Sequence, residues 1–207
     1  MDGTAFVEQI RQDNATALNR LGSEKAMIAT TEAALDRKTV LESAAAAEYR
    51  AVETVETWRD TADNDRAREA FADAAETAQD HYDRICDHGD IEVTDPPVDA
   101  LHATLRGFEA TDERVAGGLV ARPLVASRTL LQVINFFVNE ADTGSANLFR
   151  ELRSATDEQV EMGAAVLDDT CEDWDRAAAA AEAAIDAAYD EYTETLDSLG
   201  IDPKPVC

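Results

Sequence analysis

The stretch VAGGLVARPLVASRTLLQVINFFV, residues 115–138, contains no Asp or Glu, although 44 of the 207 residues of the chain are acidic. Arg122, Pro123 and Arg128 interrupt it, so it is too broken to span a bilayer. A helix that is apolar all round is normally buried at the centre of a bundle or inside a subunit interface. We therefore expect other helices to cover this segment, and part of it to mediate self-association or contact with a protein partner.

The remaining composition predicts helices. Alanine dominates, the chain has 9 Gly and 5 Pro, and aromatic residues make up 6%. These are helix-forming residues with little β signal. The length permits a sizeable core and is most simply one domain. We expect an all-α fold in which residues 1–207 form a single helical domain.

Apolar periodicity and turn signals divide this domain into core helices, flanking helices and a tail. The expected core helices span about 36–60, 66–87, 115–140 and 145–168. The expected flanking helices cover about 4–34 and 170–199, and the Pro-punctuated tail is 200–207.

Local signals predict how these helices begin and end. The first helix is expected to run from about 4 to 21, and Ser23 and Asp36 are the expected N-caps of the next two. Ser145 is the expected cap of the helix that follows residue 140, and Thr170 is the expected start of the last one. Helices at about 98–121 and 123–140 are expected to bend or separate at Arg122–Pro123.

The charge of the chain is strongly acidic. The formal net charge is −26, and Lys25, Lys38 and Lys204 are the only lysines. A lysine-poor acidic coat around a normal core is typical of proteins from salt-loving archaea, where salt screens the repulsion. We therefore expect a halophilic protein. Without a basic patch to neutralise phosphates, no nucleic-acid or membrane partner is expected.

The cysteines and the first residues favour a cytoplasmic location. Cys86, Cys171 and Cys207 are widely spaced and form no CxxC motif, which is typical of free thiols in a reducing compartment. The opening MDGTAFVEQI is acidic and amphipathic, unlike a signal peptide.

One of the three histidines, His81, lies on an apolar helical stripe within FADAAETAQDHYDRI, residues 71–85. If helices 36–60 and 66–87 form an antiparallel hairpin, His81 falls level with residues 43–48 of its partner. Glu48 lies on the apolar stripe there. A buried carboxylate is costly unless it is paired, so a contact with His81 or a shared metal ion would satisfy both groups.

These helices resemble a known family. Glu42 is followed seven residues later by Tyr49, and Phe71 ten residues later by His81. This pattern resembles the first two helices of the rubrerythrin branch of the ferritin-like superfamily. The CEDWDRAAAAA segment and the Pro-Lys-Pro-Val-Cys end are similar to short haloarchaeal rubrerythrin-like proteins. The resemblance implies a ferritin-like four-helix bundle, in which each half supplies a Glu and a Glu-x-x-His around two irons.

Most of the ligands that the resemblance implies are replaced in this chain. Ala78 stands where the first Glu-x-x-His needs Glu, and Thr156 and Gln159 stand where the second needs Glu and His. Two carboxylate-bridged irons cannot be held by the remaining Glu42 and His81. We therefore expect no cofactor, and a single iron, manganese or zinc ion at Glu42, Glu48 and His81 is the alternative. A structural His81, bonded to a carboxylate or to Tyr49, is the metal-free interpretation.

Two functional hypotheses follow. The first is a non-catalytic ferritin-like scaffold or interaction protein that has lost its di-iron site and has no catalytic residues. The second is an oxidative-stress or metal-handling protein that keeps a mononuclear metal site or acts through a reactive thiol at Cys207. The sequence contains no phosphate-cradling loop, Ser-His-Asp set or dinucleotide fingerprint that would favour another class of enzyme.

Overall fold

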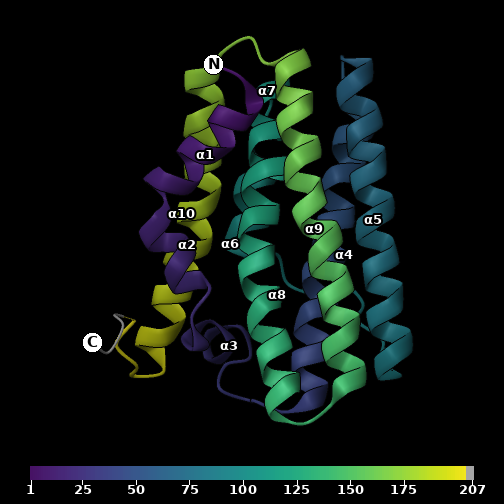
Figure 1. Ribbon diagram of the computed structural model, residues 1–207, viewed down its shortest axis with the longest axis vertical. Coiled ribbons are helices and arrows are strands. Elements are labelled where there is room, and N and C mark those ends of the chain that lie inside the picture. The colour runs from purple at the N-terminus through teal and green to yellow at the C-terminus, as the bar shows by residue number, and fades with distance from the viewer. Residues whose placement is uncertain (204–207) are drawn as a thin grey trace.

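The computed structural model describes residues 1–203, and within this range the regular elements are helices, with no strand. The prediction of an all-α bundle is therefore confirmed. Most of the helices run roughly parallel or antiparallel to one long axis (Figure 1).

Four long helical segments form two antiparallel pairs that lie side by side (Figure 1). Helix α4 (Arg37–Thr61) pairs with α5 (Asp65–Gly89), and α8 (Arg122–Asn139) pairs with α9 (Thr143–Thr170). Side-chain caps begin three of them: Asp36 accepts from Thr39 N, Asn64 from Ala67 N and Asp142 from Ser145 N. These helices correspond to the expected core helices.

Shorter helices and one long helix flank this core. They are α1 (Gly3–Asp13), α2 (Ala15–Leu21), α3 (Glu24–Thr30), α6 (Ala100–Arg106) and α10 (Trp174–Ser198). Figure 1 shows α10 and the N-terminal helices on the same side of the bundle, with α3 near its lower end.

Several predicted helix ends were wrong because polar side chains near the ends bond to the backbone in other ways than expected. The backbone of Asn14 leaves helical angles and divides the expected helix 4–21, and both its N–H and its side-chain amide donate to Ile10 O. Ser23 precedes α3 without capping it, because its hydroxyl donates to Arg20 O. Asp142 rather than Ser145 caps α9. Thr170 ends α9 rather than starting α10, which Asp173 caps.

The expected helix 98–121 is also wrong, and the helix continues through Arg122–Pro123 without separating there. Helix α6 ends at Arg106, and a new helix begins with α7 (Thr111–Arg114). It continues as a π-helix, η1 (Val115–Ala121), and passes into α8 with helical backbone angles at Arg122. The Arg122 N–H bonds to Gly117 O, five residues earlier, so π-type bonding precedes Pro123, which has no N–H to donate.

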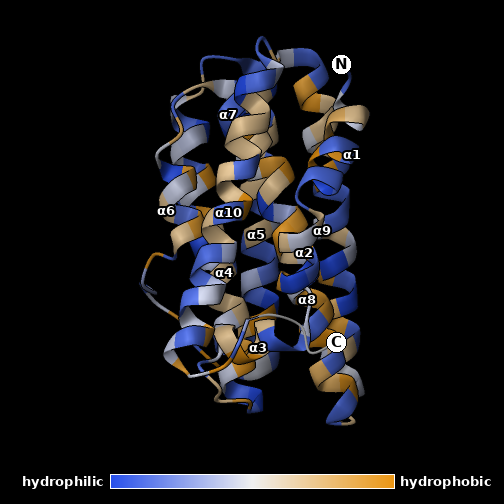
Figure 2. Cartoon of the chain, turned by 90° about the vertical axis from the view of Figure 1, so that its left-hand side faces the viewer, coloured by the Kyte–Doolittle hydropathy of each residue, from blue (hydrophilic) through white to orange (hydrophobic). Residues whose placement is uncertain are grey.

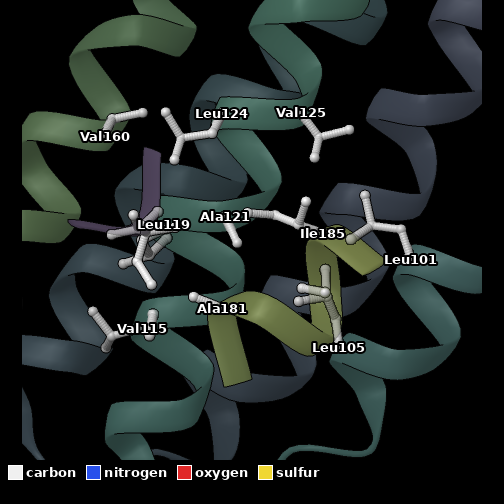
Figure 3. Packing of buried hydrophobic residues seen from close by; sticks show 14 of the residues in the cluster. Leu101, Leu105, Val115, Leu119, Ala121, Leu124, Val125, Val160, Ala181 and Ile185 are labelled. Carbon is white, nitrogen blue, oxygen red and sulfur yellow. The ribbon is translucent and has the colours of Figure 1, made fainter. Parts of the chain in front are cut away.

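The acid-free segment 115–138 lies at the centre, as predicted. All seven residues of η1 are buried. Figure 3 shows Leu119 and Ala121 of η1 among apolar side chains of neighbouring helices, including Ile185 of α10. On α8, Asn135 and Val138 are exposed. Self-association through this segment stays a prediction, and these two residues mark the surface it leaves free.

The surface of the bundle carries the acidic charge. Figure 2 shows hydrophilic residues recurring along the helices beside apolar stripes. Arginines offset part of the charge in ion pairs such as Arg84–Glu151 and Arg106–Glu53. None of the helices within the described part of the chain combines the length and apolar character needed to cross a lipid bilayer.

Withdrawing salt is expected to loosen this fold. With 44 acidic residues against 18 basic ones, lower screening strengthens the repulsion in the folded state more than in the expanded chain. Circular dichroism across a sodium chloride titration should show helicity falling as salt is removed. Sucrose serves as the control, because it favours compact states without screening charge. Unchanged helicity down to millimolar salt would show that the core alone maintains the structure.

Candidate functional site

Glu48 and His81 meet between α4 and α5. Both side chains are buried, with 6% of Glu48 and 2% of His81 exposed, and His81 Nδ1 lies 3.3 Å from Glu48 Oε1. The turn at residues 62–64 folds α5 back along α4 and brings the two residues to the same level. The contact expected between these two side chains is therefore present.

Glu42 lies apart from this pair. It precedes Glu48 by six residues on α4, which places it about 120° away around the helix. Its side chain is 38% exposed and pairs with Lys38 at 3.5 Å. Within residues 1–203, no three His, Cys, Asp or Glu side chains form a group suited to a metal ion. The structure therefore brings together two of the three predicted metal ligands.

The other half of the bundle faces this pair with a buried arginine. Arg122, at the start of α8, is 5% exposed, and its Nη2 donates to Gln159 Oε1 on α9 at 2.7 Å. Its Nε makes a longer bond of 3.4 Å to Gly118 O. Burial lowers the pKa of Arg122, while the negative charge of Glu48 acts to raise it. Arg122 and Glu48 are thus opposite charges that influence each other inside the protein.

We call Glu48, His81, Arg122 and Gln159 the polar layer. Each comes from a different core helix. The polar layer interrupts the apolar core, because one apolar cluster contains Trp58, Phe71 and Leu119, and another contains Leu41, Ile85 and Phe149. Along α4, for example, Ala45 belongs to one cluster and Val55 to the other, with Glu48 between them. Buried charges at such a place require a partner of opposite sign.

A cavity of about 520 Å³ lies beside the polar layer, lined by α3, α4, α8, α10 and the start of α6. Its polar lining includes Glu48, Arg122 and His102. Its apolar lining includes Val40, Ala44, Leu130 and Val133. Exposed Pro97 and Glu191 also line it, so the cavity opens to the surface.

His102 contributes an unusual group to this wall. Its side chain is buried, and both its backbone N–H and its ring Nδ1 lie 2.7 Å from Asp99 Oδ1. Arg50 Nη1 approaches the other oxygen of Asp99 at 3.2 Å. Among the described residues, His102 Nε2 is the buried side-chain polar atom without a hydrogen-bond partner.

The protonation of this pair follows from its surroundings. Burial acts to raise the pKa of Asp99, but the hydrogen bond from His102 and the charge of Arg50 outweigh it, so the pKa is lowered. Burial lowers the pKa of His102 against the opposing effect of Asp99. A carboxylate only accepts hydrogen bonds, so the single ring proton resides on Nδ1. Nε2 is therefore a buried acceptor.

The predicted reactive thiol, Cys207, cannot be placed relative to this site. Cys207 lies outside the described residues, and Cys86 and Cys171 are free cysteines.

Sequence reasoning missed Arg122 and His102. Arg122 carries a signal, as one of two charged residues in the acid-free segment 115–138. His102 follows Asp99 by three residues, the spacing of an N-cap.

No family model, curated protein or solved structure matches this chain. The fold and the site define the molecule instead: an all-α helical bundle whose apolar core is crossed by a charged polar layer and adjoined by an open cavity.

Proposed function

We propose that this protein is a non-catalytic ferritin-like bundle that acts by binding, with the polar layer in place of a di-iron centre. The observation that carries the proposal is the buried guanidinium of Arg122, on which the opposite charge of Glu48 acts. In a low-dielectric interior a permanent positive charge repels a metal cation strongly. Arginine also supplies five hydrogen-bond donors and no lone pair for a metal.

The remaining members of the polar layer support the same proposal. Gln159 occupies the position where the resemblance implies a histidine ligand, and its oxygen accepts from Arg122 instead. Thr156, at the position of a carboxylate ligand, donates its hydroxyl to Leu152 O within its own helix. Both residues are buried and take part in hydrogen bonds of the bundle.

The second candidate is a metal-handling protein with one ion at Glu48 and His81. The 3.3 Å contact between these two side chains favours it, since both residue types ligate iron, manganese and zinc. Such a site needs further ligands from water or a substrate, and it needs the ion to tolerate Arg122 nearby.

Metal analysis separates the two candidates. Protein purified without a histidine tag is expected to contain iron, manganese and zinc far below one ion per chain, measured by mass spectrometry. The same result is expected for His81→Gln. The matched control is His88→Gln, which changes an exposed histidine of the same helix α5. Stoichiometric metal that is lost in His81→Gln and kept in His88→Gln would overturn the proposal.

A further inference from the structure

The cavity beside the polar layer has two chemically different ends. Trp58 of α4 faces Gly118 of η1, while Val40 of α4 clusters with Val133 of α8, so α4 and α8 run antiparallel. Glu48 and Arg122 therefore mark one end of the cavity, and Val40 and Val133 mark the other. From Arg122 to Val133 the helix rises about 16 Å.

The size of the cavity suits a small molecule. Its volume of about 520 Å³ falls within the range of about 300–1,000 Å³ that is common for ligand sites. Apolar side chains such as Ala44 and Leu130 line its length, so the aliphatic part of a ligand can pack there without making hydrogen bonds. Exposed Pro97 and Glu191 at its mouth give access from solvent.

The polar end selects the head group of such a molecule. His102 Nε2 is a buried acceptor without a partner, and a buried acceptor left unsatisfied is costly. A ligand that donates a hydrogen bond to Nε2 removes this cost. Arg122 supplies donors to an oxygen of the same ligand. A hydroxyl group both donates and accepts, so it matches the two groups.

Charged head groups match less well. An anion would face the carboxylate of Glu48 and the lone pair of His102 Nε2, inside a chain with a net charge of −26. A cation would face Arg122 and Arg50, and the nearby carboxylates Glu48 and Asp99 already interact with these arginines. Both would also lose their hydration on entering the cavity.

We propose that this cavity binds a neutral amphiphile, an aliphatic body with a hydroxyl head that donates to His102 Nε2. The inference rests on the proposed function, because it names the ligand class of a binding protein. Metal content and ligand affinity are separate measurements, so either proposal can fail alone.

Octanol is the probe, and calorimetric titration of the folded full chain at constant salt is the measurement. Octanol is expected to bind equimolarly. Methyl octyl ether, which keeps the oxygen and lacks the donor, is expected to bind about tenfold more weakly, the loss typical of one hydrogen bond to a buried group. Octanoate and octylamine are expected to bind at least about tenfold more weakly than octanol.

Variants locate the binding. His102→Leu is expected to remove the difference between octanol and the ether, while the control His88→Leu keeps it. Ala126→Trp, at a partly buried position that lines the cavity, is expected to abolish binding of both. Circular dichroism verifies that each variant is folded, and the comparison of head groups in the parent protein does not depend on any variant. Absent octanol binding, equal affinities for octanol and ether in the parent protein, or a preference for octanoate would each overturn the proposal.

Discussion

Replacing Arg122 by methionine is expected to lower the free energy of unfolding by about 3–5 kcal/mol. The substitution leaves the buried carboxylate of Glu48 without its compensating charge and removes the donor that Gln159 Oε1 accepts from. Removing one of two opposite charges that influence each other inside a protein leaves the other charge uncompensated, which is strongly destabilising. Urea unfolding followed by circular dichroism, at one fixed salt concentration, measures the change.

The double variant tests the cause. Arg122→Met combined with Glu48→Gln removes both charges, and it should recover most of the stability, because an uncharged layer of similar volume carries no desolvated ion. Arg128→Met is the matched control, since Arg128 lies on the same helix with its side chain only partly buried. Its effect should stay within about 0.5 kcal/mol. Additive losses in the double variant would contradict the coupling between Arg122 and Glu48.

Gly163→Ala is expected to lower the free energy of unfolding by about 2–3 kcal/mol. A Cβ atom at Gly163 would lie 2.5 Å from the carbonyl oxygen of Leu119 and 2.8 Å from its carbon. These are backbone atoms of η1, so α9 and η1 must move apart to admit the methyl group. The loss outweighs the gain of about 1 kcal/mol that alanine brings to a helix interior. The same urea titration provides the measurement.

Gly144→Ala is the control on the same helix. A Cβ atom there meets its nearest neighbours at 3.6 and 3.7 Å, ordinary contact distances. This variant should be neutral or more stable by about 0.5 kcal/mol, because alanine restricts the unfolded chain. If Gly163→Ala proved as stable as Gly144→Ala, the contact between α9 and η1 would have to be loose enough to yield without cost.

The core helices could be predicted from the sequence because their signals reinforce one another. Asp36 begins α4, and an apolar stripe follows it at helical spacing to Trp58. The same register reasoning brought Glu48 and His81 together, since a hairpin with a short turn fixes which levels of two helices meet. In a long periodic helix many residues specify the same buried face and the same register with the neighbouring helix. These predictions therefore did not depend on any single residue.

The failures involved single side chains with several possible partners. Asp142, Ser145 and Asp173 can each cap a helix, and only the tertiary arrangement decides which one does. The candidate ligand Glu42 rested on the resemblance carried by its spacing from Tyr49, and that spacing does not specify how far its side chain lies from His81. Arg122 was interpreted as an interruption of an apolar segment, because the sequence near Arg122 does not show that Gln159, 37 residues later, accepts its hydrogen bond.

The π-helix η1 has a consequence for how related chains should be aligned. Its bonding to the fifth preceding residue uses about one residue more per turn than an α-helix. In an uninterrupted α-helix one extra residue would rotate everything upstream by about 100° around the axis, and the wider turn of η1 absorbs that rotation. A homologue with one residue deleted between 115 and 121 is therefore expected to form a plain α-helix there and to keep the flanking residues pointing in the same directions. An alignment that places the gap inside 115–121 then matches the two interiors, and one that shifts the gap into α8 does not.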